Sequence, residues 1–258
     1  MSASRANTEN KKRVALVSGS SRGIGRGIAM ALARSGYMVF VNGRTDAIVA
    51  TTVKEIEAEG GRARALVSDL TRDDRAQDAI KKVLELEGQL DLLVLNLGSG
   101  RTPNDWNPPA QEMRRVFDVN FFSAVALTSA ALQLMKPGSN IVFIASIAGV
   151  EALGAPIAYS SAKTALLSYA KTLSVQAAPK GIRVNSVSPG NVLFEGSTWD
   201  DKIKKDEAAV KQYIKDQVPL NGFATPNDIA QAVTFLVSSP FVTGHNLVVD
   251  GGQTRKPI

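Results

Sequence analysis

The chain has 258 residues, of which 44% are hydrophobic, and 30 Lys and Arg against 24 Asp and Glu give it a net charge of +6. It has no cysteine and one histidine, His245, so disulfides, thiolate metal sites, cysteine nucleophiles and histidine-cluster metal sites are excluded. We therefore expect no metal. The basic residues are scattered along the chain, which argues against a nucleic-acid partner.

The first residues, MSASRANTEN, are polar and lack the apolar segment of a secretory signal. We expect residues 1–12 to be a disordered lead-in and residues 13–258 to form a single domain. The most apolar stretch, FFSAVALTSAALQLM, is interrupted by Ser, Thr and Gln and falls short of the ~18–20 apolar residues that span a bilayer. The sequence therefore predicts a cytoplasmic protein with no membrane partner.

Short apolar, β-branched runs recur along the chain, starting at positions 14, 38, 64, 92, 140, 182 and 246. Helical patterns such as GRGIAMALARSG and AIVATTVKEIEAEGG separate the first three. Runs that are apolar on both faces and alternate with helices are typical of buried parallel strands. The sequence predicts an α/β fold: a doubly wound, seven-stranded parallel sheet of the Rossmann type, with helices on both faces.

The segment SGSSRGIG at 18–25 follows the first strand and opens the first helix, as a phosphate-binding glycine loop requires. Gly19 would permit the tight turn. Gly23 would let the backbone approach a pyrophosphate, and Gly25 would let the helix pack on the strand. We expect a nucleotide at this loop.

The second strand ends in VNGRT and carries no acidic residue between Val39 and Thr45. An acid at this position usually binds a free ribose 2′-hydroxyl, whereas an arginine accommodates a 2′-phosphate. Arg44 stands just past the strand, and Arg22 in the glycine loop would be its partner. Either arginine could instead be a plain surface residue, but the pair favours NADP(H) over NAD.

Tyr159 and Lys163, in YSSAK, would be neighbours on one helix face. A nearby cation favours the ionised form of a phenol, which suits proton transfer near neutral pH. Taken alone, the pair rather indicates a helix start with a surface Tyr and a solvated Lys, and the rest of the chain has to decide.

Two helices, at 121–135 and 159–178, carry small or apolar residues nearly all round and are expected to be buried or to pack against another subunit. The charged segment 191–216 follows SPG directly, at the strand ends where ligands bind in such sheets. It is a candidate substrate lid; the alternative is an ordinary surface helix.

Several motifs in this order resemble the short-chain dehydrogenase/reductase family over roughly residues 13–253, in particular the branch with the 3-oxoacyl-acyl-carrier-protein reductases. They are the glycine loop, SDL at 68–70, NLG at 96–98, VN at 119–120, IAS at 144–146, YSSAK, SPG at 188–190 and LVVDGG at 247–252.

The resemblance implies site roles. Tyr159 would be the general acid/base and Lys163 would lower its pKa and bind the nicotinamide ribose. Ser146 would orient the substrate oxygen, and Asn120 would hold a water in the proton relay. Asp69 would contact the adenine and Asn96 the adenosine part. The family pattern places the cofactor against Gly19, Ser21, Arg22, Gly23, Ile24, Gly25, Arg44, Asp69, Leu70, Asn96, Gly98, Tyr159, Lys163, Pro189, Gly190 and Val192. It also implies a homotetramer, or a homodimer, through the two apolar helices.

The chain departs from the family at several positions. Ser18 replaces the usual Thr. LNLG replaces the common NNAG, so Leu95 and Leu97 alter the contacts beside the cofactor. Phe194 stands where a threonine often reaches the cofactor's carboxamide. The loop at 98–109, with Arg101 and Trp106, is either substrate-facing or a plain surface loop.

The sequence thus predicts an NADP(H)-dependent oxidoreductase that interconverts a ketone and a secondary alcohol on a small or carrier-linked substrate, such as a 3-oxoacyl thioester. A sugar or sugar-derivative ketone is an alternative substrate. A non-catalytic protein that senses NADP(H) is a further alternative. A serine hydrolase would need His245 as its base, and His245 is expected to be a turn residue.

Overall fold

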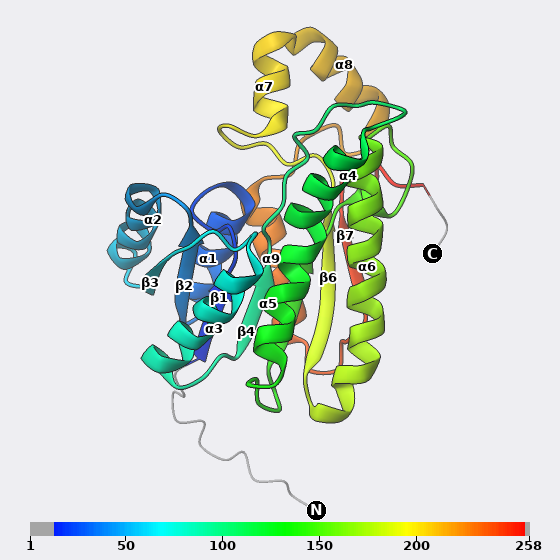
Figure 1. Ribbon diagram of the computed structural model, residues 1–258. Helices are drawn as coiled ribbons and strands as arrows, with labels where there is room; N and C mark the ends of the chain where they lie inside the picture. The colour runs from blue at the N-terminus through cyan, green and yellow to red at the C-terminus, as the bar shows by residue number, and fades with distance from the viewer. Residues whose placement is uncertain (1–12, 256–258) are drawn as a thin grey trace, which may run out of the picture.

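The computed structural model describes residues 13–255 of the chain. The predicted lead-in at 1–12 lies outside these residues. Seven strands form one parallel sheet, in the order β3-β2-β1-β4-β5-β6-β7 (Figure 1). The strands are β1 Arg13–Val17, β2 Tyr37–Gly43, β3 Arg62–Val67, β4 Leu92–Leu95, β5 Asn140–Ile144, β6 Arg183–Pro189 and β7 Asn246–Val249. This confirms the predicted doubly wound sheet.

Nine α-helices connect the strands within the described residues. A π-helical turn, Asp118–Phe122, joins α4 to α5. The α-helices are α1 Gly23–Arg34, α2 Asp46–Ala58, α3 Asp73–Glu87, α4 Ala110–Phe117, α5 Ser123–Leu132, α6 Ile157–Ala177, α7 Thr198–Lys205, α8 Glu207–Gln217 and α9 Pro226–Ser238.

The apolar runs form strands because helices cover both of their faces. Every residue of β2, β4 and β5 is buried. One core cluster joins the sheet to Ile80 of α3, Leu127 of α5 and Leu166 of α6. A second cluster joins the opposite face to Ile28 of α1 and Val233 of α9. Strands buried on both sides need no polar face, which explains their continuous apolar sequence.

The continuous helical stretch Ala110–Leu132 is long and apolar enough, with a mean hydropathy of 1.2 over its best window, to meet a length-and-composition test for crossing a membrane. The sequence analysis missed it because the stretch extends beyond the single apolar run. The core helix of a globular protein passes the same test. Here Leu127 and Ala131 of this stretch lie in the core cluster against the sheet.

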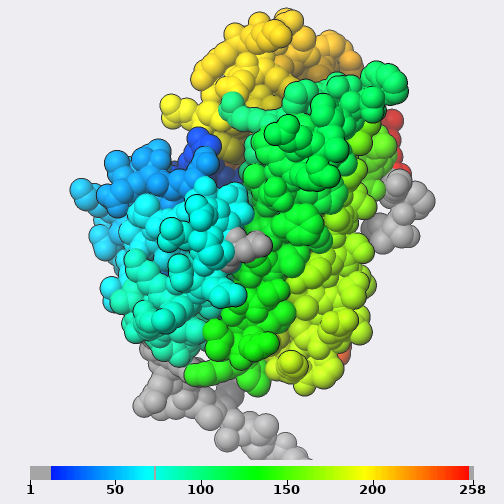
Figure 2. Space-filling view, viewed as in Figure 1, coloured from blue at the N-terminus to red at the C-terminus, as the bar shows by residue number. Residues whose placement is uncertain are grey.

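The order of the strands fixes where a ligand can bind. From β1 the chain passes to β2 and β3 on one side of the sheet and then returns to β4 on the other side of β1. The connections therefore diverge at the carboxyl ends of β1 and β4, which is where open α/β sheets bind their ligands. Helices α7 and α8 lie over this end of the sheet, and Figure 2 shows them as the yellow cap of the molecule.

Candidate active site

The glycine loop at 18–25 is hydrogen-bonded to the end of β2. The Ser20 backbone N–H donates to the Asn42 carbonyl (2.8 Å), and the Asn42 N–H donates to Ser20 Oγ (2.9 Å). The buried Asn42 side chain accepts from the Gly19 N–H (2.9 Å) and donates to the carbonyls of Leu66 and Ser68. Sequence reasoning missed Asn42, although an amide in an otherwise apolar strand was a visible signal.

The other side of the glycine loop is held by the segment after β4. Ser18 Oγ accepts from the backbone N–H of Asn96 (2.9 Å) and of Leu97 (3.1 Å). Asn96 Nδ2 in turn donates to the carbonyls of Ser18 and Gly19, both at 3.0 Å. Asn96 therefore positions the loop. The hydroxyl that the chain keeps at position 18 has a defined role.

The altered LNLG motif is accommodated by packing. Leu95 is buried in the core cluster beneath the sheet, so no amide is needed at its position. Leu97 is partly buried and packs over the loop: a Cβ added to Gly19 would lie 3.2 Å from Leu97 Cδ1. The motif thus changes the wall of the site and leaves the anchoring by Asn96 intact.

The loop's glycines are required by its geometry. Gly19 and Gly23 have φ of +61° and +56°, which disfavour other residues. A Cβ on Gly25 would lie 2.4 Å from the Gly19 carbonyl oxygen and 2.5 Å from Asn96 Nδ2, as expected where a helix packs tightly on a strand. Arg22 caps α1 without a side-chain hydrogen bond, so the first N–H groups of this twelve-residue helix are not capped by it. These residues fit the phosphates of a nucleotide.

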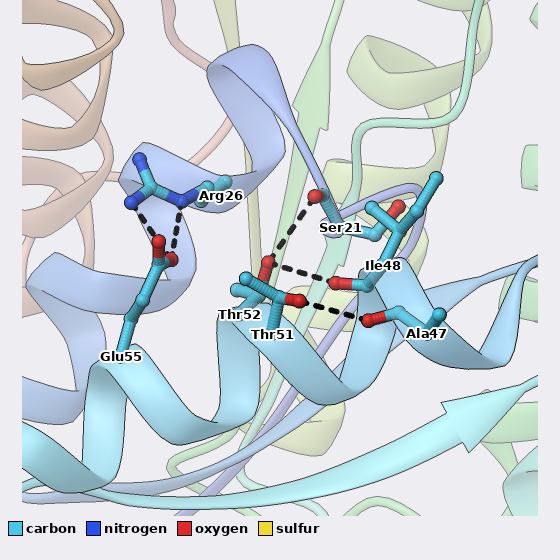
Figure 3. Close-up of a pocket in the computed structure, with 7 residues that line it drawn as sticks. All are labelled: Ser21, Arg26, Ala47, Ile48, Thr51, Thr52 and Glu55. Atoms are coloured by element: carbon cyan, nitrogen blue, oxygen red, sulfur yellow. Dashed lines mark hydrogen bonds and ion pairs between the residues drawn. The ribbon is translucent and has the colours of Figure 1, made fainter.

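Helix α2 braces the loop from the side, around a hollow of about 240 Å³ (Figure 3). Thr52 Oγ1 donates to the Ser21 carbonyl (3.1 Å), and Arg26 Nη2 lies 2.7 Å from Glu55 Oε2. Tyr159 and Lys163 do not line this hollow, so it is support for the loop and not a reaction site.

Arg22 and Arg44 are both exposed. Arg22 lies two residues after Ser20, and Arg44 lies two residues after Asn42. Ser20 and Asn42 are hydrogen-bonded to each other. The fold therefore brings the backbone of the two arginines to the same end of β2. Ile24, by contrast, is partly buried and packs against the core, which limits what its side chain can offer a ligand.

The side chains of the residues just after β3 make contacts within the protein. Asp69 Oδ1 accepts from the N–H (3.2 Å) and the hydroxyl (2.7 Å) of Thr71, so Asp69 forms a turn. The Leu70 side chain is buried in the core at 1% exposure, so any contact of Leu70 with a cofactor has to come from its backbone.

Four predicted catalytic residues converge at the carboxyl end of β5. Tyr159 and Lys163 lie on α6, with Lys163 Nζ 5.8 Å from the Tyr159 ring centroid and 3.0 Å from the Ile144 carbonyl, which it donates to. Ser146 begins the short helix after β5, and its Oγ accepts from the Ala148 N–H (3.1 Å). Ser146 Oγ also hydrogen-bonds the Tyr159 phenol.

Asn120 reaches the same point from the π-helical turn. Its amide donates to the carbonyls of Ser99 (3.1 Å) and Val116 (2.9 Å) and accepts from the Ser99 N–H (2.9 Å). A Cβ on Gly98 would lie 2.9 Å from Asn120 Oδ1 and 3.1 Å from Lys163 Nζ. Residues 96–98 therefore touch the glycine loop at one end and the catalytic cluster at the other.

Burial is the largest cause of the pKa shifts of Tyr159 and Lys163. Burial raises the pKa of Tyr159, and the hydrogen bond from Ser146 opposes this rise. Burial lowers the pKa of Lys163 from 10.5 to about 8. Lys163 Nζ is directed to the Ile144 carbonyl, so the lowering of the phenol pKa by Lys163 stays a prediction.

The segment after β6 closes the other side of the site. At Gly190 a Cβ would lie 2.8 Å from Asp250 Cα, and Val192 is buried and forms an isolated bridge with Ala224. The ring of Phe194 lies against Gly23 of the glycine loop. Pro189 is the last residue of β6.

Helices α7 and α8 and the loop at 98–109 form a cover over this end of the sheet. Trp199 packs on Tyr213 and Phe223, with ring centroids 5.1 and 5.5 Å away. Arg101 Nη2 lies 2.6 Å from Asp201 Oδ2 and donates to the Gly196 carbonyl at 2.9 Å. The loop also passes beside Tyr159, since a Cβ on Gly100 would lie 3.8 Å from the Tyr159 ring.

Two other predictions concern residues away from this cluster. Trp106 is 87% exposed, so its side chain does not line the site. His245 lies just before β7, where its backbone N–H donates to Asn185 Oδ1 (3.0 Å). It lies in the connection before β7, as expected.

The sequence profile described as "Enoyl-(Acyl carrier protein) reductase" matches residues 19–254. The 3-oxoacyl-[acyl-carrier-protein] reductase of Synechocystis is 32% identical over 247 residues, 93% of this chain and 96% of that one. Glucose 1-dehydrogenase 2 of Bacillus subtilis is 32% identical over 252 residues, 95% of this chain and 96% of that one.

Solved structures agree. A short chain dehydrogenase from Burkholderia cenocepacia J2315 in complex with NADP has a TM-score of 0.85 and 29% identity, covering 94% of this chain and 97% of that one. A 7α-hydroxysteroid dehydrogenase with NADH has a TM-score of 0.86 and 28% identity, covering 97% and 98%. The chain belongs to the short-chain dehydrogenase/reductase family, whose members are oxidoreductases acting on CH–OH or C=O groups.

The depressed pKa of Lys163 predicts a pH dependence of stability. A lysine whose folded pKa is about 8 against 10.5 unfolded makes the unfolded chain bind more protons between these values, so its contribution to stability rises with pH. From pH 7 to 9.5, wild type should gain about 2 kcal/mol relative to Lys163→Met. Urea unfolding at both pH values measures this; an equal change in both proteins would contradict it.

Proposed function

We propose that the protein is an NADP(H)-dependent oxidoreductase that interconverts a ketone and a secondary alcohol. The observation that carries the proposal is the convergence of Ser146, Tyr159 and Lys163, which residues 96–98 connect to the glycine loop. A phenol, a hydroxyl and an ammonium beside a nucleotide-binding loop suit the transfer of a proton to a carbonyl oxygen while a hydride reaches its carbon.

A bound nicotinamide dinucleotide supplies the hydride in reduction or accepts it in oxidation. Tyr159 gives its phenolic proton to the carbonyl oxygen in reduction and takes it back in oxidation. Ser146 Oγ accepts from Ala148, and its O–H would turn from the Tyr159 phenol to the same oxygen as negative charge develops there. Lys163 is largely protonated below pH 8 and stabilises the phenolate that forms. A water in the relay would bind the backbone of the π-helical turn, because the Asn120 amide is already engaged.

The substrate that we propose is a 3-oxoacyl thioester carried on a small molecule or on a carrier protein, by analogy with the Synechocystis relative. A sugar ketone is the second candidate. It is favoured by the polar rim that Arg101, Asn104 and Asp201 form around the cover, where Asn104 Nδ2 also donates to the Gly154 carbonyl (3.4 Å).

Arg44→Asp should abolish the preference for NADPH. In wild type we expect NADPH to bind at least about tenfold more tightly than NADH, a difference of about 1.4 kcal/mol, because Arg22 and Arg44 meet the 2′-phosphate. Fluorescence titration of both dinucleotides measures the ratio. Arg62→Asp, at the amino end of β3, is the matched control and should keep the preference. Equal binding of the two cofactors by wild type would overturn the assignment.

Tyr159→Phe should reduce ketone turnover by about 10²–10⁴-fold while NADPH binding changes little, because the variant loses only the transferable proton. NADPH oxidation with a panel of 3-oxoacyl thioesters and sugar ketones measures turnover. Tyr169→Phe, on the same helix and within the aromatic cluster with Phe121 and Phe143, is the control. A wild type that binds NADPH and reduces none of these ketones would favour the sensing protein.

We also propose a homotetramer, or failing that a homodimer. Phe122 beside α5 and Val175 on α6 are 49% and 69% exposed, as expected where apolar helix faces meet a second copy. Light scattering after size exclusion should give about four times the chain mass of 27.4 kDa. A mass equal to one chain would exclude both assemblies.

A further inference from the structure

The side chain of Phe194 occupies the space that Gly23 leaves open. A Cβ built on Gly23 would lie only 2.5 Å from Phe194 Cε2 and 2.6 Å from Cζ, so the edge of the ring rests on the glycine backbone. The ring is partly buried and packs with Ile24 against the core beneath the loop. Because Gly23 has no side chain, another group can come close to its backbone. In this structure that group is an aromatic ring of the same chain.

This position is the one at which the phosphates of a dinucleotide need room. Gly23 is the first residue of α1, and the preceding Arg22 makes no side-chain cap. An anion at a helix start is held by backbone N–H groups and by the helix dipole. A phenyl ring supplies neither a donor nor a positive charge, and it excludes the anion from the space that it fills. The ring and a pyrophosphate compete for the same backbone.

The backbone around Phe194 shows which segment would move with the ring. On one side Leu193 N–H donates to the Ala224 carbonyl (2.9 Å), and the Ala224 N–H donates to the Asn191 carbonyl (2.9 Å), which fixes the stem. On the other side the Ser197 N–H donates to the Phe194 carbonyl (3.0 Å). Ser197 Oγ also caps α7 at Asp200. Phe194 is thus joined directly to the start of α7.

The polar contact between this segment and the loop at 98–109 is a weak one. Arg101 binds Asp201 and the Gly196 carbonyl, and the side chains of Arg101 and Asp201 are 58% and 50% exposed. Exposed ion pairs contribute little to stability, so the contact with the loop at 98–109 does little to hold the start of α7. Trp199 packs on Tyr213 and Phe223 and would keep α7 joined to α8 as it moves. The stem at Val192 and Ala224, with Val192 buried, would stay in place.

We propose that Phe194 is a gate on the nucleotide site. Its ring closes the pyrophosphate position in the free protein, and cofactor binding displaces it together with residues 196–205. Phe194 therefore sets the affinity and the association rate of the cofactor, an inference that rests on the proposed function. The fraction of molecules with the ring withdrawn scales the apparent affinity, since only those molecules are competent to bind.

Phe194→Ala tests the gate directly. Stopped-flow fluorescence of NADPH should show faster association, and the equilibrium Kd should fall by about fivefold or more, because the closed population no longer competes. The control is Phe241→Ala, which removes a fully exposed ring near the start of β7 and should leave both quantities unchanged. Phe194→Leu, which keeps part of the side-chain volume, should give an intermediate Kd and serves if the alanine variant does not fold.

A second readout follows the movement of α7 without any turnover. In a Trp106→Phe background, Trp199 of α7 is the remaining tryptophan, and its emission should change when NADPH is added to the protein. With Phe194→Ala as well, the emission without NADPH should already lie closer to that of the bound protein.

Weaker NADPH binding by Phe194→Ala would mean that the ring clamps the bound cofactor, and it would overturn the gate, as would an unchanged Kd. Either result leaves the proposed function standing, provided that wild type binds NADPH. If neither wild type nor the variant binds NADPH or NADH, the proposed function fails and the gate fails with it.

Discussion

The site depends on a small set of side-chain hydrogen bonds that hold the glycine loop to the ends of the strands. The part of the loop before α1 takes its partners from two neighbouring strands: Asn42 of β2 accepts from the Gly19 N–H, and Asn96 after β4 donates to the Ser18 and Gly19 carbonyls. The buried Asn42 amide both donates and accepts, and leaving such a buried group unpaired costs about 1–3 kcal/mol. The phosphate-binding backbone is thereby fixed before any ligand arrives, which keeps the cost of ordering it out of the binding step.

The catalytic cluster is organised by burial. Lys163 is 3% exposed and its ammonium donates to the Ile144 carbonyl, so a buried lysine lies next to a buried phenol. Desolvation moves the pKa values of the two groups apart, since it raises that of Tyr159 from 10.0 and lowers that of Lys163 from 10.5 to about 8. Both shifts favour the neutral form of each group, which keeps the phenolic proton on Tyr159 until it is transferred.

The sequence was informative where a residue's role follows from local pattern. The seven apolar runs became the seven strands, and the glycine loop and YSSAK lie where their context placed them. It was less informative where the role depends on a distant partner. The pattern did not indicate that Asp69 accepts from Thr71, that the Leu70 side chain enters the core or that Asn96 holds the loop; their cofactor contacts stay predictions. The importance of Asn42 and the contact between Phe194 and Gly23 arise only when segments about 20 and 170 residues apart meet, which no local pattern encodes.

The helical stretch Ala110–Leu132 contains a π-helical turn at Asp118–Phe122. Because of this turn, the stretch holds one residue more than a regular α-helix of the same axial length would hold. One residue corresponds to about 100° of rotation about the helix axis. Asn120 can therefore point into the catalytic cluster while Leu127 and Ala131 still face the sheet. Deleting a single residue here would rotate the helix before the turn relative to the helix after it. Asn120 and the core residues Leu127 and Ala131 could then no longer both face their own partners. The extra residue thus lets one helical stretch present Asn120 to the proposed site and its apolar side chains to the core.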